Sequence, residues 1–320
     1  MKAITQDAYG TTEMLSCTDI PVPEVGQDGV LIRVRAAGVD RGVQHFMTGL
    51  PLVSRPALGL RKPRQRVRGM DVSGIVEQVG PRVTGFRPGD EVLGTAPGAF
   101  AEFACAPAHR LRHKPENLSF EQAATLPISG MTALGGLRDS GRIEAGQQVL
   151  IIGASGGVGH LAVQLAKHFG AEVTGVCSGS AAEFVRSLGA DHVIDYTSEN
   201  LTGRYDLILD MAGNRPLPLL RALLTDSGAL VLGGGEGGGR WFGGLERSLS
   251  AQLRSPFVKQ RLRVLLSLPR PEALQAVTEL ATAGTLIPRV TRTFTLPEAA
   301  AAVDHLIDGH PRGKIALRIG

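Results

Sequence analysis

The chain has 320 residues, a formal net charge of +4 and an apolar share of 43%. This length allows two domains with sizeable cores. The sequence contains no run of about 18 apolar residues that could span a membrane, and its first residues lack the basic-then-apolar order of a secretion signal. Cys17, Cys105 and Cys177 are too scattered for a disulfide framework or a structural zinc knuckle, so we expect a reducing, cytoplasmic location.

Residues 1–121 consist mainly of short β-like runs separated by glycine and proline, which predicts a β-rich first domain. Within it, residues 55–68 carry six arginines and lysines. We interpret this stretch either as a solvated loop or as a rim that attracts an anionic cofactor or substrate. Nucleic acid is a poor candidate partner because no stacking aromatic residues are interleaved with the charges.

From about residue 119 the pattern changes to helices, at 120–126 and 129–140, and then strands and helices alternate. The predicted strands lie at 149–153, 172–177, 192–195, 205–211 and 229–232, and the helices between them at 158–169, 180–188 and 216–224. This alternation predicts a doubly wound parallel sheet. The apolar run 261–268 is predicted as its edge strand, and after a helix at 271–283 the β-like segments 288–296 and 313–318 are expected to rejoin the first domain.

The most informative segment is VLIIGASGGVGHLAVQLAKHFGAEVTGVC, residues 149–177. It predicts a strand, a tight glycine turn, a helix and a second strand, which is one βαβ unit of dinucleotide-binding type. Gly156 would let the backbone approach a pyrophosphate, and Gly159 would let helix and strand pack closely. Ala154 stands where the first glycine of the usual fingerprint would be. Because a helix N-terminus offers amides and a positive dipole, we expect the phosphates at Ser155, Gly156, Gly157, Val158 and Gly159.

The same turn also matches the G-x-S-x-G pattern of a serine hydrolase, with Ser155 as nucleophile. Asp210 and His305 follow in the order that hydrolases use. A hydrolase usually has several βαβ units before this turn, whereas the first half of this chain has short β-like runs. The phosphate-binding interpretation is therefore preferred, and the hydrolase is kept as an alternative.

The end of the second strand bears on the choice of cofactor. An NAD-binding unit usually carries an acid about 20 residues after the glycine turn, but the sequence has no Asp or Glu between Glu172 and Glu183. The hydroxyls of Ser178 and Ser180 could donate to a 2′-phosphate, or Ser178 or Ser180 could simply cap the next helix. We expect NADPH in preference to NADH.

Taken together, these motifs resemble the medium-chain dehydrogenase/reductase superfamily, in particular its zinc-lacking, zeta-crystallin-like quinone oxidoreductases near the reticulon-interacting oxidoreductases. The resemblance rests on AAGVDRGVQHFMTG (36–49), VTGFRPGDEVLG (83–94), LSFEQAATLPISGMTAL (118–134), SLGADHVIDY (187–196), YDLILDMAGN (205–214) and GHPRGKIAL (309–317). It implies a GroES-like β-barrel substrate domain, residues 1–121 with 268–320 returning to it, and a Rossmann NADPH-binding domain, residues 122–267.

The zinc alcohol dehydrogenases of this superfamily place Cys where this chain has Asp40, and His where it has Met70. Methionine and a lone carboxylate are poor replacements for catalytic zinc ligands. His45 lies nearby in the sequence, but an isolated histidine is more often a packing residue. We therefore predict no bound metal.

The resemblance also implies site residues. Tyr196 is expected to contact the cofactor phosphate. The nicotinamide end is expected near Thr132, Gly213, Gly233 and Gly234, with Lys314 approaching from the first domain. Asp40 and Thr132 are the candidate catalytic residues, and His45, Phe46 and Trp241 are expected to shape the substrate pocket. Relatives tend to have Asp and Trp where this chain has Val43 and Gln44, which affects substrate identity.

A site without a metal Lewis acid is better suited to a conjugated acceptor than to simple alcohol oxidation. We therefore predict hydride transfer from NADPH to a quinone or an α,β-unsaturated carbonyl. The alternative is a nucleotide-binding sensor or structural protein with little turnover. A homodimer is predicted through the edge strand near 261–268, because an unpaired strand edge tends to recruit a partner.

Overall fold

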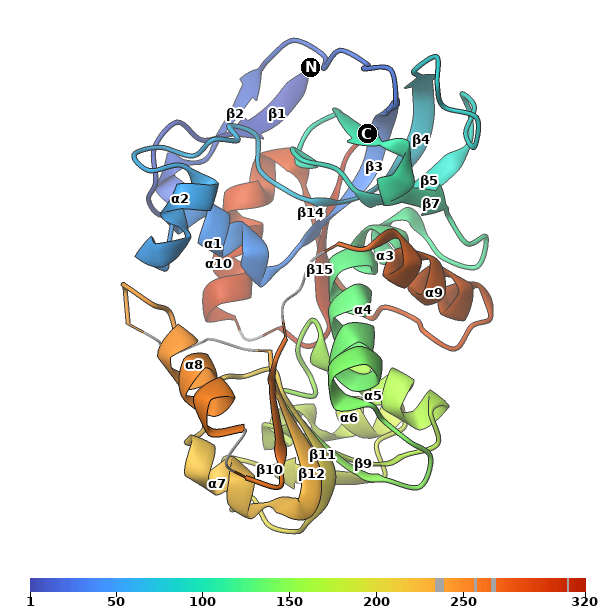
Figure 1. The fold of residues 1–320 in the computed structure, drawn as a ribbon. Coiled ribbons are helices and arrows are strands. Elements are labelled where there is room, and N and C mark those ends of the chain that lie inside the picture. Colours follow the sequence, from blue (N-terminus) through green and yellow to red (C-terminus); the bar gives the residue numbers. More distant parts are fainter. Residues whose placement is uncertain (234–238, 256–257, 266–268, 310) are drawn as a thin grey trace. The chain divides into compact units, whose positions relative to one another are not determined.

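The computed structural model describes residues 1–233, 239–255, 258–265, 269–309 and 311–320 (Figure 1). The chain divides into two compact units, Met1–Met131 with Pro269–Gly320, and Thr132–Leu268. The return of the C-terminal segment to the first unit follows the expected order. The first junction lies at Met131, later than the expected position at residue 121, because the helix that follows residue 119 packs on strands of the first unit.

The first unit contains a seven-stranded sheet in the order β14-β15-β3-β4-β5-β7, with β6 paired to β3, and a separate antiparallel pair of β1 and β2. β14 and β15 run parallel, and the other pairs along this sheet are antiparallel. The strands are β1 (Lys2–Thr5), β2 (Ser16–Asp19), β3 (Gly29–Val39), β4 (Asp71–Val79), β5 (Glu91–Thr95), β6 (Phe103–Pro107), β7 (Leu111–His113), β14 (Val290–Thr295) and β15 (Lys314–Arg318).

Helices of the first unit are α1 (Arg41–Thr48), α2 (Arg55–Leu58), α3 (Phe120–Thr125), α9 (Pro271–Thr282) and α10 (Ala299–Asp308). Ser119 forms a capping box with Gln122 at the start of α3, and this helix contacts β3, β4 and β15. The sequence patterns do not predict α1 or α10. Only Val43 and Met47 of α1 are buried, so its apolar stripe is too short to be noticed.

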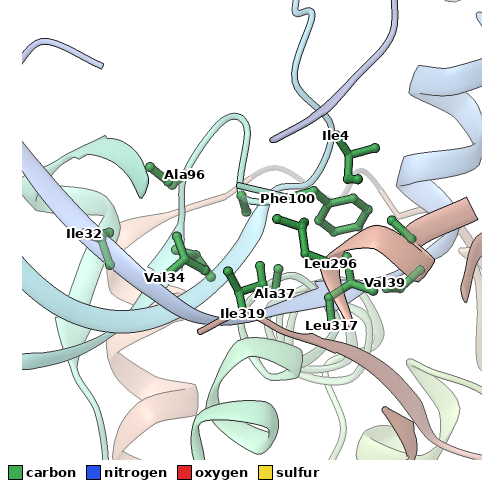
Figure 2. Close-up of a cluster of buried hydrophobic side chains, with 14 of the residues drawn as sticks. Ile4, Ile32, Val34, Ala37, Val39, Ala96, Phe100, Leu296, Leu317 and Ile319 are labelled. Atoms are coloured by element: carbon green, nitrogen blue, oxygen red, sulfur yellow. The ribbon is translucent and has the colours of Figure 1, made fainter. Parts of the chain in front are cut away.

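The core of the first unit lies where the sheet meets the segment around Phe100 and the C-terminal strands. Figure 2 shows Ile4, Val39, Phe100, Leu296 and Leu317 packed together from segments far apart in the sequence. Phe100 is fully buried. This packing fixes β1 and the neighbouring segment before β4, where Arg68 forms backbone hydrogen bonds with Ile4 and Phe100.

The second unit contains a parallel six-stranded sheet in the order β10-β9-β8-β11-β12-β13. Numbered within this unit the order is 3-2-1-4-5-6, which is the doubly wound dinucleotide-binding topology. The strands are β8 (Gln148–Ile152), β9 (Glu172–Cys177), β10 (His192–Asp195), β11 (Tyr205–Asp210), β12 (Leu224–Leu232) and β13 (Arg261–Val264). The predicted fold class is confirmed, and β13 is the edge strand.

The helices of the second unit are α5 (Gly159–His168), α6 (Ala182–Ser187), α7 (Leu217–Ala222) and α8 (Leu245–Arg254). α4 (Pro127–Leu134) spans the junction between the units and continues into a π-helical stretch, Gly135–Gly141. Helix α8 was not predicted. No helix in the described part of the chain combines the length and apolar character needed to cross a bilayer. Short 3-10 helices occupy Thr12–Met14, Leu52–Ser54, Ala108–Arg110, Gly179–Ala181 and Leu296–Glu298.

Candidate functional site

The turn between β8 and α5 is shaped by glycines. Gly153 has a φ of +82°, and its N–H and that of Ala154 both donate to the carbonyl of Val176, at 3.1 and 3.0 Å. A Cβ on Gly159 would overlap the carbonyl of Gly153, so only glycine lets α5 start this close to β8. The predicted packing role of Gly159 therefore has a clear geometric basis.

The N-terminal turn of α5 presents backbone donors. In the described part of the chain, no hydrogen-bond acceptor is found for the N–H groups of Ser155, Gly157, Val158 or Gly159. The first three of these residues and Gly156 are half-buried. A Cβ on Gly156 would meet only the carbonyl of Gly153, at 3.3 Å, so the space in front of Gly156 is open. Open space, spare amides and a helix N-terminus fit a phosphate group.

The two predicted serines lie together at the end of β9. The hydroxyl oxygens of Ser178 and Ser180 are 3.2 Å apart. Ser178 precedes the 3-10 helix Gly179–Ala181, but its side chain makes no capping hydrogen bond there. Capping therefore does not account for the Ser178 hydroxyl, and the pair stays a predicted phosphate contact.

Arg215 is a residue that the sequence analysis missed. Its guanidinium carbon lies 5.8 Å from the ring centre of Tyr196, which is 47% exposed. The Nε of Arg215 is buried, and no hydrogen-bond partner is found for it among the described residues. The loop after β9 lacks a lysine or arginine, but Arg215 brings a cation to Tyr196 from the loop that follows β11. In the sequence, the only sign of a role for Arg215 is its position directly after Ala212-Gly213-Asn214, at the end of the YDLILDMAGN motif.

An acid lies beside the serine loop in space, although none occurs there along the chain. A Cβ on Gly179 would overlap the carboxylate of Asp195, at the end of β10. Hydrogen bonds from the side chain and then the backbone N–H of Thr197 hold the pKa of Asp195 below its usual value. Asp195 thus places a negative charge beside the serine loop, which the positive charge of Arg215 has to outweigh for NADPH to be preferred.

At the end of β11, Asp210 is fully buried and paired. Its carboxylate accepts the N–H groups of Ala212 and Gly213, at 3.2 and 3.0 Å, and lies 2.5 Å from Nη2 of Arg247. Gly213, with a φ of +73°, closes this turn. A triad carboxylate would instead orient a histidine. The ring nitrogen Nδ1 of His305 lies 3.4 Å from Arg292, so the structure gives the hydrolase alternative no support.

The remaining residues predicted at the nicotinamide end lie in the second unit. Gly233 donates its N–H to the carbonyl of Asp210 at 2.9 Å and has no room for a side chain beside Met211. Thr132 is 7% exposed. Trp241, which we predicted in the substrate pocket, is 68% exposed, next to the exposed Phe242. Gly234 lies outside the described residues.

In the first unit, Asp40 and Lys314 lie near a buried acid. Asp40 caps α1, because its Oδ1 accepts the N–H groups of Gly42 and Val43. Asp71 is fully buried, and both of its oxygens accept the N–H of Ile128, at 3.2 and 3.3 Å.

Burial, and then the charge of Asp40, raise the pKa of Asp71 well above its usual value. Lys314 is only 2% exposed and donates to the hydroxyl of Ser129 at 2.8 Å. Its ammonium group is therefore already engaged within the first unit.

A small cavity lies between α1 and the segment before β4. Val43 and Phe46 line it from α1, and Val67, Arg68 and Met70 line it from the other side. Phe46, which we predicted in the substrate pocket, thus borders a cavity. The predicted neighbour His45 is exposed and its Nδ1 lies 3.0 Å from the carbonyl of Leu50, within hydrogen-bonding distance.

Among the described residues, no three His, Cys, Asp or Glu side chains are grouped so that they could hold a metal ion. The positions that correspond to zinc ligands are Asp40, which caps α1, and Met70, which lines the cavity. Zinc independence stays a prediction.

Comparison with known proteins adds the family. The model described as "Alcohol dehydrogenase GroES-like domain" matches residues 26–116, and that described as "Zinc-binding dehydrogenase" matches residues 188–317. The mitochondrial NAD(P)H oxidoreductase RTN4IP1 of Bos taurus is 33% identical over 100% of this chain and 89% of its own length.

Two further relatives extend the comparison. The NADPH-dependent alkenal/one oxidoreductase, chloroplastic, of Arabidopsis thaliana is 37% identical over 67% of this chain and 58% of its own length. The structure of the quinone oxidoreductase from Coxiella burnetii superposes with a TM-score of 0.84 at 31% identity, over 100% of this chain and 99% of that one.

The fold and the relatives together define an NAD(P)H-dependent oxidoreductase. The chain belongs to the medium-chain dehydrogenase/reductase superfamily, as the sequence motifs predict.

Proposed function

We propose that this protein is a zinc-independent reductase that uses NADPH to reduce quinones or α,β-unsaturated carbonyls. The observation that carries the proposal is the open N-terminal turn of α5, with its spare amides and the space in front of Gly156. The alkenal/one and quinone reductases among its relatives support this class of acceptor. When bound, NADPH supplies a hydride from its nicotinamide ring.

Two groups of residues in the second unit would bind different parts of the dinucleotide. The amides of Ser155, Gly157 and Val158 would donate to the diphosphate, helped by the dipole of α5. At the other end, Tyr196 and Arg215 would receive the 2′-phosphate with the hydroxyls of Ser178 and Ser180.

The proposal of a reaction without zinc rests on the chemistry of the donor set. Met70 offers a thioether where a zinc enzyme has an imidazole, and the Oδ1 of Asp40 already caps α1. A conjugated acceptor spreads the incoming charge onto an oxygen, which a few hydrogen bonds can stabilise. Asp40 and Thr132 stay our candidates for catalytic polar groups.

Steady-state turnover tests the proposal. The purified protein is given NADPH with a panel of quinones and enones, and loss of absorbance at the NADPH wavelength is followed with and without a chelator. We expect continuous turnover that the chelator does not change. Tight NADPH binding with no turnover across the panel would favour a sensor or structural role, and loss of turnover with the chelator would contradict zinc independence.

We also propose that two copies associate through β13. Among the described strands, β13 has a neighbour on one side only, and Leu262 on it is buried within its own unit. Because Arg263 is exposed on the same strand, association should weaken when Arg263 is replaced by glutamate. Sedimentation velocity of the wild type and of Arg263→Glu tests this; a monomeric wild type would contradict it.

A further inference from the structure

Arg68 has no role in the cofactor binding or the hydride transfer proposed for this protein. Arg68 is only 3% exposed, although it belongs to the basic stretch 55–68 that looks solvated in the sequence. Its Nη1 donates to the carbonyl of Phe46 at 3.0 Å. Nε and Nη2 are buried, and neither finds a hydrogen-bond partner among the described residues.

The backbone around Arg68 is held firmly, so the side chain is not placed by chance. The N–H of Arg68 donates to the carbonyl of Ile4 at 3.0 Å, and its carbonyl accepts the N–H of Phe100 at 2.9 Å. Gly69, with a φ of +90°, lets the chain pass close to the ring of Phe100. Ile4 and Phe100 belong to the core cluster in Figure 2.

The two unpartnered groups lie on one edge of the guanidinium. Nε and Nη2 form the side-on pair of donors that matches the two oxygens of a carboxylate. The same chain shows this pairing two residues earlier, where Nε and Nη2 of Arg66 donate to the two carboxylate oxygens of Asp7, at 2.6 and 3.1 Å. Arg66 has its carboxylate partner on the surface, whereas no carboxylate partner is found for Arg68 in the part of the chain that the structure describes.

The surroundings of Arg68 favour an organic anion. Besides Arg68 and Gly69, the small cavity is lined by the apolar side chains of Val43, Phe46, Val67 and Met70 and by the polar side chain of Gln65. Burial lowers the pKa of Arg68 to about 10, so the guanidinium is still cationic at neutral pH. A buried cation without an anion is costly, and a bound carboxylate would relieve that cost.

We propose that Arg68 is a binding site for the carboxylate of an acceptor substrate, so that the natural acceptors include enones or quinones that carry an acid group. The inference deepens the proposed reductase function and rests on it for the identity of the ligand as a substrate. The basic stretch around Arg68 would attract such an anion, and Arg68 would hold it by the edge that carries Nε and Nη2.

Binding of a simple carboxylate tests the site without turnover. Benzoate, its neutral analogue benzamide, and inorganic phosphate are titrated into the wild type, Arg68→Met and Arg66→Met, with melting temperature and calorimetry as readouts. Arg66→Met is the matched control, because it removes the same charge from an arginine that pairs with Asp7 on the surface. We expect benzoate to bind and stabilise the wild type and Arg66→Met but not Arg68→Met, while benzamide binds none of them.

Benzoate binding to all three proteins or to none would overturn the site, and phosphate binding in place of benzoate would overturn its assignment to carboxylates. A second arm compares 4-oxopent-2-enoate with its methyl ester as acceptors. We expect the wild-type KM for the acid to be at least tenfold below that for the ester, and the two to become equal in Arg68→Met or Arg68→Gln. Turnover of both acceptors with equal KM in the wild type would reject the Arg68 site and leave the reductase function intact.

Discussion

Each unit contains an arginine with little exposure to solvent, buried Arg68 in the first unit and half-buried Arg247 in the second, and the two differ in their partners. In the second unit, Arg247 pairs with the buried carboxylate of Asp210 at the end of β11. In the first unit, Arg68 lines a small cavity, and neither a carboxylate nor any other hydrogen-bond partner is found for its Nε and Nη2 among the described residues. Removal of Arg247 would leave the buried charge of Asp210 without a cation, which is strongly destabilising, whereas removal of Arg68 would leave no buried anion behind.

The largest effect on stability is expected from removal of Arg247, the arginine that pairs with Asp210. Arg247→Met leaves the fully buried Asp210 without its cation, so the free energy of unfolding should fall by about 3 kcal/mol. Urea unfolding of the full chain measures this. Arg204→Met is the control, since it breaks an exposed pair with Asp226 and should cost less than about 1 kcal/mol. Equal losses in the two variants would contradict the comparison.

The unpaired arginine should behave in the opposite way. Arg68→Met removes a buried cation and loses one hydrogen bond to the carbonyl of Phe46. Because the first change outweighs the second, the free energy of unfolding of the variant should be about 1 to 2 kcal/mol higher than that of the wild type. The measurement is the same urea titration in a buffer free of carboxylates. A loss of stability as large as that of Arg247→Met would mean that Arg68 is a structural residue.

A third arginine, Arg215, is expected to bind the cofactor. Arg215 lies beside Tyr196 with an unpartnered Nε, and we expect it to hold the 2′-phosphate that distinguishes NADPH from NADH. Arg215→Gln should raise the NADPH dissociation constant about tenfold, or about 1.4 kcal/mol, and change that of NADH by less than about twofold. Fluorescence titration with both cofactors measures this, with the exposed Arg204→Gln as control. Equal weakening for both cofactors would remove Arg215 from the 2′-phosphate site.

The smallest effect concerns a buried acid, whose pKa is raised by burial and then by the charge of Asp40. Above the usual pKa of about 4, the unfolded chain releases the Asp71 proton and the folded chain retains it, so this group lowers stability as the pH rises towards its folded pKa. Asp71→Asn removes that dependence.

We therefore expect the melting temperature of Asp71→Asn, relative to the wild type, to be higher at pH 8 than at pH 4. Any loss of the hydrogen bond from Ile128 should shift both ends of the profile equally, so the slope is the test. Parallel pH profiles for the two proteins would show that Asp71 is not protonated by burial.

The parts of the site that follow from neighbouring residues could be predicted from the sequence. The spacing of Gly153, Gly156 and Gly159 between an apolar run and a helical stripe fixes the turn of the βαβ unit locally. The same holds for the strands of the second unit and for its helices α5, α6 and α7, whose alternation predicts a parallel sheet, whereas α8 was missed.

The parts that depend on tertiary contacts could not be predicted. Arg215 reaches Tyr196 from another loop, and Asp195 reaches Gly179 from another strand, so neither pair has a sequence signature. Arg68 stands among five other basic residues, so the sequence predicts that it lies on the surface. Its burial depends on backbone hydrogen bonds to Ile4 and Phe100, which are distant in the sequence.

The most direct test of the central claim is a calorimetric titration of NADPH into the wild type and Gly156→Val. A valine at Gly156 would fill the space in front of the α5 amides, while its Cβ meets only the carbonyl of Gly153, at 3.3 Å. We predict one NADPH per wild-type chain and an affinity at least about 100-fold lower, or about 2.7 kcal/mol weaker, in Gly156→Val with an unchanged melting temperature. A wild type that takes up no NADPH, or a variant that binds it equally well, would contradict the account.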